Sequence, residues 1–190
     1  MMCGRYYIEE DDGALAQVIE KAQSRKGSGE NIKTGEIFPT DIVPVICNNK
    51  RLERSVFPMR WGFYRPQSSS TAFNARIETA GSSSFFGDSF RNRRCVIPAS
   101  CYFEWKSEGK RKIKYKIRAA ADRIVYMAGI YTTMQGEDVP RFAVLTCNPT
   151  IDIAGIHDRM PVMIPPDGID EWLNSGKLPA DIVPMRASSV

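Results

Sequence analysis

Five short strand-like segments dominate the part of the chain between residues 95 and 147. They cover residues 95–98, 102–106, 113–118, 124–131 and 141–147. Residue pairs typical of turns separate several of them, at Glu108-Gly109, Ala121-Asp122 and Gln135-Gly136. Segments of this length are too short for ordinary helices, and their spacing is typical of consecutive antiparallel strands. The sequence therefore predicts a meandering antiparallel sheet in this region.

The rest of the chain predicts short helices and one more hairpin. Apolar residues have helical spacing over 14–22, directly after Asp11 and Asp12, which are good capping residues. Strands are expected at 42–47 and 52–57 around a turn at 48–50, and loops at 24–29 and 67–71. Further helices are expected after a turn at 81–84, ending at Phe90, just before His157, and over 168–174. Together these elements predict an α+β fold, a mostly antiparallel sheet or open barrel with short flanking helices.

The length of 190 residues, without an internal repeat or a linker, favours one domain over residues 1–190. Hydrophobic residues make up 43% of the chain and charged residues 25%, which is enough for a sizeable core. No apolar run approaches the ~20 residues of a membrane helix. The first seven residues lack the apolar segment of a secretory signal. We therefore expect a cytoplasmic protein that does not contact a membrane.

The cysteine pattern argues against a metal site. The five cysteines form no C-x-x-C pair, and the chain has a single histidine, so few ligands are available for zinc. Three of the cysteines lie in apolar, strand-like stretches, where they are expected to act as small buried hydrophobic residues: Cys47, Cys95 and Cys147. The sequence predicts neither a metal ion nor a small-molecule cofactor.

Positive charge is concentrated in the first two thirds of the chain. Residues 1–136 carry 22 Lys and Arg against 14 Asp and Glu, a balance of +8, whereas residues 137–190 have a balance of −4. The densest run, Lys106–Arg118, suits a phosphate backbone. Its lysines alternate with other residues, so it also fits the solvated face of a strand. On charge alone, the solvated face is the favoured interpretation.

Cys3 has a distinctive reactivity if the two methionines before it are removed. An N-terminal amine has a pKa of about 7.7–8.0, compared with about 10.4 for lysine, so more of it is nucleophilic at neutral pH. The amine can capture an aldehyde as a Schiff base, and the thiol on the adjacent carbon can then close a five-membered thiazolidine. From its position alone, however, Cys3 is more simply interpreted as an early strand residue without a chemical role.

His157 and Glu104 are the candidate acid–base groups. Taken alone, the single histidine is equally expected as a proton-transfer group or a structural residue, but its place among polar residues between a predicted helix and a strand favours a functional site. Glu104 lies between Phe103 and Trp105. A partly buried carboxyl group would have a raised pKa and deliver a proton, whereas strand alternation would also allow it to face solvent. The residues leave both alternatives open.

Three further residues suit a bound DNA strand. Asn74 can orient a reactive group, and Arg76 can bind a phosphate. Trp61 can stack on a base, as aromatic residues do in proteins that bind single strands. A tryptophan is nevertheless more often part of a core or its rim.

Six segments, in this order, resemble the SOS-response-associated peptidase (SRAP) family of abasic-site sensors. They cover nearly the whole chain: Cys3-Gly4-Arg5, Arg60-Trp61-Gly62, Asn74–Thr79, Arg94–Ala99, Phe103-Glu104-Trp105 and His157–Pro161. The resemblance implies a β-rich fold with a basic groove. It also implies a protein that binds single-stranded DNA and crosslinks to the ring-opened aldehyde of an abasic site, without a metal or cofactor.

The resemblance also implies a role for each matching residue. Cys3 forms the thiazolidine, Asn74 orients its amine or the opened sugar, Glu104 is the acid–base group, and His157 assists proton transfer. The implied DNA contacts are Arg5, Trp61, Arg76 and Arg159, the last two on phosphates. Two features depart from the family pattern. An extra methionine precedes Met2, so self-processing or a start at Met2 would be needed, and Cys101 stands where glycine is common.

Two other functions remain open. Cys3, His157 and either Asn74 or Glu104 also fit a thiol peptidase, and limited self-cleavage would expose Cys3. Trp61 and the arginines also fit a protein that binds single strands without reacting. A crosslink to an abasic strand distinguishes both alternatives from the aldehyde-trapping function.

Overall fold

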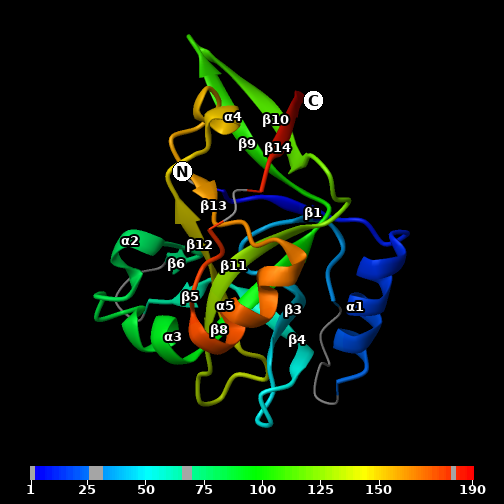
Figure 1. The fold of residues 1–190 in the computed structure, drawn as a ribbon, viewed down its shortest axis with the longest axis vertical. Coiled ribbons are helices and arrows are strands. Elements are labelled where there is room, and N and C mark those ends of the chain that lie inside the picture. Colours follow the sequence, from blue (N-terminus) through cyan, green and yellow to red (C-terminus); the bar gives the residue numbers. More distant parts are fainter. Residues whose placement is uncertain (1–2, 26–31, 66–69, 181–182) are drawn as a thin grey trace.

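Two β-sheets form the centre of the molecule (Figure 1). The computed structural model describes residues 3–25, 32–65, 70–180 and 183–190. The first sheet has five strands in the order β14-β10-β9-β1-β2, all paired antiparallel. Its strands are β1 (Tyr6–Ile8), β2 (Gly35–Ile37), β9 (Cys101–Glu108), β10 (Arg111–Ala119) and β14 (Met185–Ser189).

The second sheet closes on itself. Its strands follow the order β11-β8-β3-β4-β12-β13, and β11 also pairs with β12, which completes a barrel. Most pairings are antiparallel, but β12 runs parallel to β4 and to β7. The strands are β3 (Ile42–Asn48), β4 (Arg54–Trp61), β7 (Asn74–Arg76), β8 (Arg94–Ala99), β11 (Val125–Thr132), β12 (Arg141–Cys147) and β13 (Met160–Pro161).

Short helices and a small ribbon lie around the sheets (Figure 1). The ribbon pairs β5 (Phe63–Tyr64) with β6 (Thr71–Ala72). The helices are α1 (Gly13–Gln23), α2 (Ile77–Ala80), α3 (Gly87–Asn92), α4 (Ile151–Ala154), the 3-10 turn η1 (Pro166–Gly168) and α5 (Ile169–Ser175). No helix in the described ranges has the length and apolar character that crossing a bilayer requires.

Helix α1 shows how local sequence sets an element. The Asp12 side chain accepts hydrogen bonds from the backbone N–H groups of Ala14 and Leu15, which have no partner within the helix. Leu15, Ile19 and Ala22 are buried. Their spacing of three to four residues places them on one face, which packs against β3 and β4.

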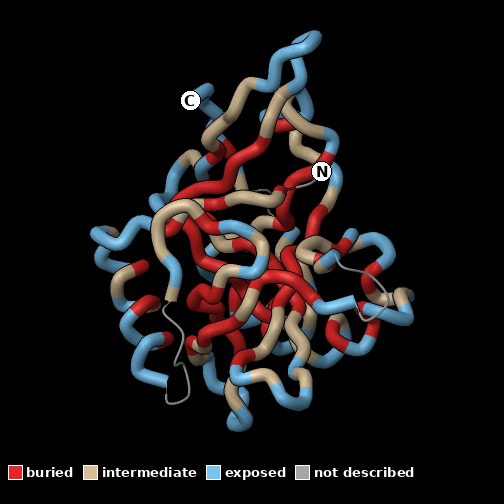
Figure 2. Tube along the Cα trace, turned by 180° about the vertical axis from the view of Figure 1, so that it is seen from behind, coloured by how far each residue is buried: buried red, intermediate tan, exposed pale blue. Residues whose placement is uncertain are grey.

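One apolar core joins the two sheets. Tyr6, Tyr102 and Ile117 from the first sheet belong to the same cluster of buried side chains as Val43 and Met127 from the second. Figure 2 shows buried residues running through the middle of the molecule, whereas the tips of the outer loops are exposed. The β9–β10 hairpin extends beyond this core, and Gly109 at its tip adopts a φ of 61°, which favours glycine (Figure 1).

The predicted fold class is confirmed, and most predicted elements are present. The helix over 14–22, the five strands between 95 and 147 and the three later helices all occur. The strand predicted at 52–57 starts later and runs to Trp61, because Leu52 belongs to the turn, with a φ of 61°. Parts of the two predicted loops, residues 26–29 and 67–69, lie outside the described residues.

The simple meander is wrong. β9 and β10 pair with each other in the first sheet, whereas β8, β11 and β12 belong to the second. β8 therefore pairs with β3 and β11 and not with β9. Between β8 and β11 the chain changes sheets twice, which lets both sheets bury an apolar face against the same core.

Candidate functional site

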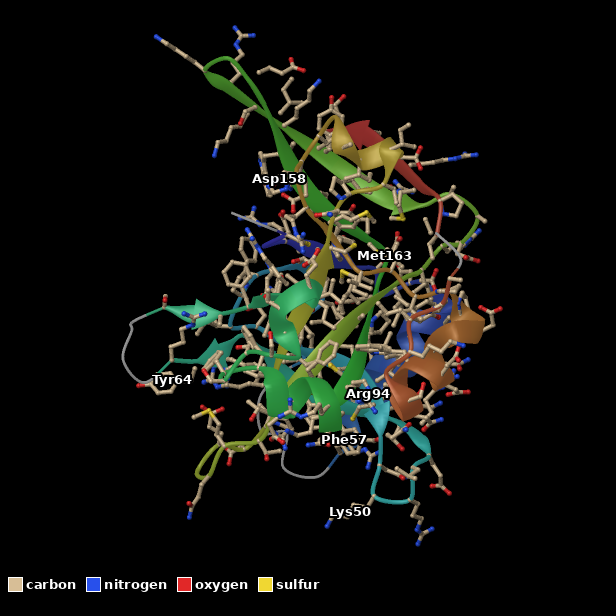
Figure 3. All side chains as sticks on the ribbon, turned by 60° about the vertical axis from the view of Figure 1, so that its left-hand side comes forward. Lys50, Phe57, Tyr64, Arg94, Asp158 and Met163 are labelled. Atoms are coloured by element: carbon tan, nitrogen blue, oxygen red, sulfur yellow. The ribbon has the colours of Figure 1, made fainter. Side chains whose placement is uncertain are left out.

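A pocket of about 650 Å3 lies along the edge of β9, near the start of the described chain. Strand β1 pairs with β9 as far as Tyr102, and the Phe103 N–H still donates to the Arg5 carbonyl, so the edge of β9 is open on this side only beyond Phe103. The loop after α4 borders the same opening, and Asp158 on that loop lies close to the β9–β10 hairpin (Figure 3). The lining residues are Gly4, Arg5, Glu104, Trp105, Lys106, Ser107, Lys112 and residues 154–158.

Cys3 is held at the inner end of this site by both of its backbone groups. Its N–H faces the carboxylate of Glu104 and stabilises the charged form, and its carbonyl accepts a hydrogen bond of 3.1 Å from Asn74 Nδ2. Its side chain is 1% exposed. Burial raises the pKa of the thiol well above its ordinary value, the negative charge of Glu104 adds to this, and the backbone N–H of Arg5 opposes it. The thiol is therefore protonated at neutral pH.

Glu104 is a buried carboxyl group, which decides between the two alternatives left open by the sequence. It is 2% exposed, on the face of β9 that points into the protein. Burial raises its pKa to about 7, and hydrogen bonds from the backbone N–H groups of Cys3 and Trp105 limit the rise. A carboxyl group with this pKa can both give and accept a proton near neutral pH.

His157 lies next to Glu104, with its Nε2 3.8 Å from Glu104 Oε2, beyond hydrogen-bond distance. Its Nδ1 lies 3.1 Å from the backbone N of Arg159 and 2.9 Å from Asp158 Oδ1. A neutral ring nitrogen cannot accept from one and donate to the other. The backbone contact is the fixed one, because the Asp158 side chain is 86% exposed. Nδ1 therefore accepts, and the proton of the neutral ring is on Nε2, facing Glu104.

Four residues that are far apart in the sequence thus lie together. Asn74 comes from β7, which runs alongside β12, and Glu104 comes from β9. His157 follows α4, and Cys3 precedes β1. The structure places the four predicted catalytic residues at one site, with the amide and the carboxylate bound to either side of the Cys3 backbone.

Of the four predicted DNA contacts, two are accessible. Arg5 lines the pocket, with its guanidinium 4.1 Å from the centre of the Phe38 ring and 5.2 Å from that of Trp105. Its Nη1 also lies 3.3 Å from Glu36 Oε1. Arg76 is exposed, directly before α2 and two residues after Asn74.

The structure contradicts the other two. Trp61 is completely buried, its Nε1 donates a 2.9 Å hydrogen bond to the Phe73 carbonyl, and its ring centre is 4.9 Å from that of Tyr6. It is a core residue and cannot stack on a base. Arg159 is 7% exposed, and both of its terminal nitrogens donate to Glu78, each at 2.8 Å. Its guanidinium is bound inside the protein and does not face a phosphate.

Three lining residues had not been singled out as site residues. Trp105, Lys106 and Lys112 surround the pocket mouth. The sequence favours a solvated strand face for the run Lys106–Arg118. In the structure, however, Lys114 lies 4.0 Å above the Phe103 ring and forms an ion pair with Glu36. Pairing of Lys114 with Trp105 across β9 and β10 would have identified these side chains as neighbours of the pocket. That register is visible only in the tertiary structure.

A larger hollow of about 740 Å3 lies elsewhere, beside β10 and β14. It contains none of the four grouped residues. Its lining carries four acidic side chains (Glu9, Asp11, Asp12 and Asp122) and four basic ones (Lys116, Arg118, Arg123 and Arg186), a balance that does not attract a phosphate backbone. Within the described residues, no three His, Cys, Asp or Glu side chains gather in a way that could hold a metal ion.

Comparison with known proteins places this arrangement in a family. Abasic site processing protein YoaM of Bacillus subtilis is 30% identical over 187 residues, which is 91% of this chain and 79% of that protein. Abasic site processing protein YedK of Escherichia coli is 33% identical over 132 residues, 66% of this chain and 59% of its own length.

Solved structures agree in fold. A protein from Bordetella bronchiseptica superimposes with a TM-score of 0.77 at 22% identity and covers 99% of both chains. A protein from Bacteroides thetaiotaomicron has the same TM-score and identity and covers 99% of this chain and 92% of its own. The sequence model of the SOS response associated peptidase (SRAP) family matches residues 2–187. The chain therefore belongs to the SRAP family.

Proposed function

We propose that this protein captures abasic sites in single-stranded DNA through the amine and thiol of Cys3. One observation carries the proposal: Asn74 binds the Cys3 carbonyl, and the backbone nitrogen of Cys3 faces Glu104, a buried carboxyl group whose pKa is about 7. When the chain begins at Cys3, that nitrogen is the α-amine. The nucleophile and its acid–base group are then in contact before the substrate arrives, which lowers the entropic cost of the reaction. The names of the relatives, abasic site processing proteins, support the choice of substrate.

The reaction has two covalent steps. In the first, the neutral amine attacks the aldehyde carbon of the ring-opened abasic sugar, and the hydroxyl leaves as water with a proton from Glu104, which gives an iminium ion. In the second, the thiol gives its proton to the Glu104 carboxylate, and the sulfur attacks the iminium carbon. The C=N electron pair moves to nitrogen, which becomes the secondary amine of a thiazolidine.

The neighbouring residues have supporting roles. Asn74 fixes the Cys3 carbonyl, and so the direction of the amine. His157 exchanges the proton of Glu104 with solvent, because it is the titratable side chain beside that carboxyl at the pocket wall. Arg5, Lys106 and Lys112 at the mouth attract the phosphates on either side of the lesion. Arg76, which is exposed two residues after Asn74, binds a further phosphate.

The first test compares two forms of the protein. The chain that begins at Cys3 and the chain that retains Met2 are each incubated with an abasic single-stranded oligonucleotide and with an intact one. Intact mass after denaturation should show protein plus DNA minus one water, only for the first form and only with the abasic strand. Cys3→Ser, which keeps the amine, should stop at an adduct that borohydride reduces. An equal yield from the Met2 form would refute the proposal.

The same samples distinguish the alternatives. Salt-sensitive binding of both oligonucleotides without an adduct would support a protein that only binds DNA. Repeated cleavage of a peptide would support a thiol peptidase, which the buried, protonated thiol of Cys3 does not favour. Glu104→Gln should slow adduct formation at least tenfold and leave the binding of the intact strand unchanged, because a general acid–base group typically contributes about 10²–10⁴-fold.

A further inference from the structure

Tyr102 is an aromatic residue at the site that the proposed reaction does not yet use. It lies on β9 two residues before Glu104, so the two side chains share one face of the strand. It is completely buried, and it packs in the same cluster as Cys3. Its partner across the strand pair is Tyr6 on β1. Tyr102 therefore borders the inner side of the Cys3 and Glu104 pair.

The Tyr102 hydroxyl has no hydrogen-bond partner among the described residues. A buried hydroxyl without a partner lowers stability, and phenylalanine would fill the same space without this cost. Burial raises the pKa of this phenol, and the charges of Cys3 and Glu104 raise it further. The hydroxyl thus remains a protonated donor on the strand face that carries Glu104, and it has no acceptor among the described residues before the reaction.

During the proposed ring closure, the Cys3 sulfur gives up its proton and carries negative charge as it attacks the iminium carbon. Burial, Glu104 and Cys101 all disfavour its thiolate, and only the backbone N–H of Arg5 is known to favour it. A neutral donor that approaches the sulfur would stabilise the charge without adding a counter-ion that competes for Glu104. The unpartnered phenol meets this requirement.

We infer that Tyr102 donates its hydroxyl hydrogen bond to the Cys3 sulfur while the thiazolidine ring closes, a role that rests on the proposed function. The proton of the thiol still passes to Glu104, and the sulfur still forms its bond to the iminium carbon. Tyr102 keeps its own proton throughout. It accelerates the second covalent step and leaves the first, in which the amine attacks the aldehyde, unchanged.

Tyr6 supplies a matched control. It is also completely buried, and its hydroxyl also has no partner among the described residues. After burial, the largest influence on the pKa of Tyr6 is the charge of Asp41, followed by Cys3, whereas for Tyr102 it is Cys3, followed by Glu104. The two hydroxyls therefore have different surroundings at neighbouring positions of one strand pair, and Cys3 affects Tyr6 less than Asp41 does. Removing either one takes away a single buried oxygen and changes the packing equally little.

The test uses the chain that begins at Cys3, with Tyr102→Phe and Tyr6→Phe as its two variants. Each protein reacts with an abasic single-stranded oligonucleotide, and samples are reduced with borohydride at increasing times. The reduced imine adduct is heavier than the thiazolidine adduct by two hydrogens, so intact mass separates the open form from the closed one. The ratio of the reduced imine adduct to the thiazolidine adduct reports ring closure. A purely structural role of Tyr102 would not change this ratio.

Tyr102→Phe should accumulate the reducible imine and form the closed adduct about tenfold more slowly, the effect of one hydrogen bond to a charged group. Tyr6→Phe should delay ring closure less than Tyr102→Phe, because Asp41 and not Cys3 is the main charge near the Tyr6 hydroxyl. Both variants should melt at or above the parent's temperature, because each loses an unpartnered hydroxyl. Equal ratios in all three proteins, or equal delays in both variants, would refute the role of Tyr102. A parent that forms no adduct at all would instead refute the proposed function.

Discussion

The buried charge of Glu104 gives a measurable dependence of stability on pH. Its pKa rises from 4.5 to about 7 on folding, because the carboxylate is removed from water. Each pKa unit corresponds to about 1.4 kcal/mol, so the ionised group costs about 3 kcal/mol in the folded protein. The group has its full stabilising effect below pH 4.5, where it is neutral in both states. That stability is lost as the pH rises through about 7.

Glu104→Gln removes this charge and keeps the shape of the side chain. Glu104 Oε1 is buried without a partner, so the amide nitrogen can take its place without breaking a hydrogen bond. We therefore expect the free energy of unfolding of the variant to rise by about 2.5 kcal/mol relative to the parent between pH 5 and pH 8, because part of the effect is already present at pH 5. For a protein of this length the gain corresponds to a relative rise in melting temperature of about 5–10 °C.

The assay is thermal unfolding of both proteins at pH 5, 6, 7 and 8. The quantity compared is the change with pH of their difference in melting temperature, because all other titrating groups are common to both. The intact mass is recorded first, since a free α-amine at Cys3 would lower the pKa of Glu104 and reduce the gain. A difference that stays constant from pH 5 to pH 8 would refute the assignment of Glu104 as a buried, proton-exchanging group.

Three other variants test where the side chains point. Trp61→Phe should lower the free energy of unfolding by about 1–3 kcal/mol, because core volume and the hydrogen bond to a buried carbonyl are lost; DNA binding by the folded protein, measured by fluorescence anisotropy, should stay the same. Arg159→Gln should lower the free energy of unfolding, measured with urea, by about 1–2 kcal/mol, because Glu78 loses its bidentate partner. The loss is small because Glu78 is partly exposed to water. Arg76→Gln should leave stability unchanged and reduce the slope of log affinity against log salt by about 1, whereas an unchanged slope would exclude a phosphate contact.

The local elements of the fold were predictable because their causes are local. Asp12 and the helical spacing of Leu15, Ile19 and Ala22 determine α1. Glu108-Gly109 determines the turn between β9 and β10. The pairing of the strands was not predictable, because which edges meet depends on how two sheets cover one core. The very short strands β1, β2, β7 and β13 were missed for the same reason, since their pairing partners lie far away in the sequence.

The chemistry of the site divides in the same way. The sequence by itself determined the reagents: a cysteine near the start of the chain, one histidine, and an acid between two aromatic residues. Only the tertiary structure decided that Glu104 is buried, that it contacts the nitrogen of Cys3, and that Trp61 and Arg159 point inwards. Reactivity belongs to a residue type, whereas burial and contact depend on what the rest of the chain places around it.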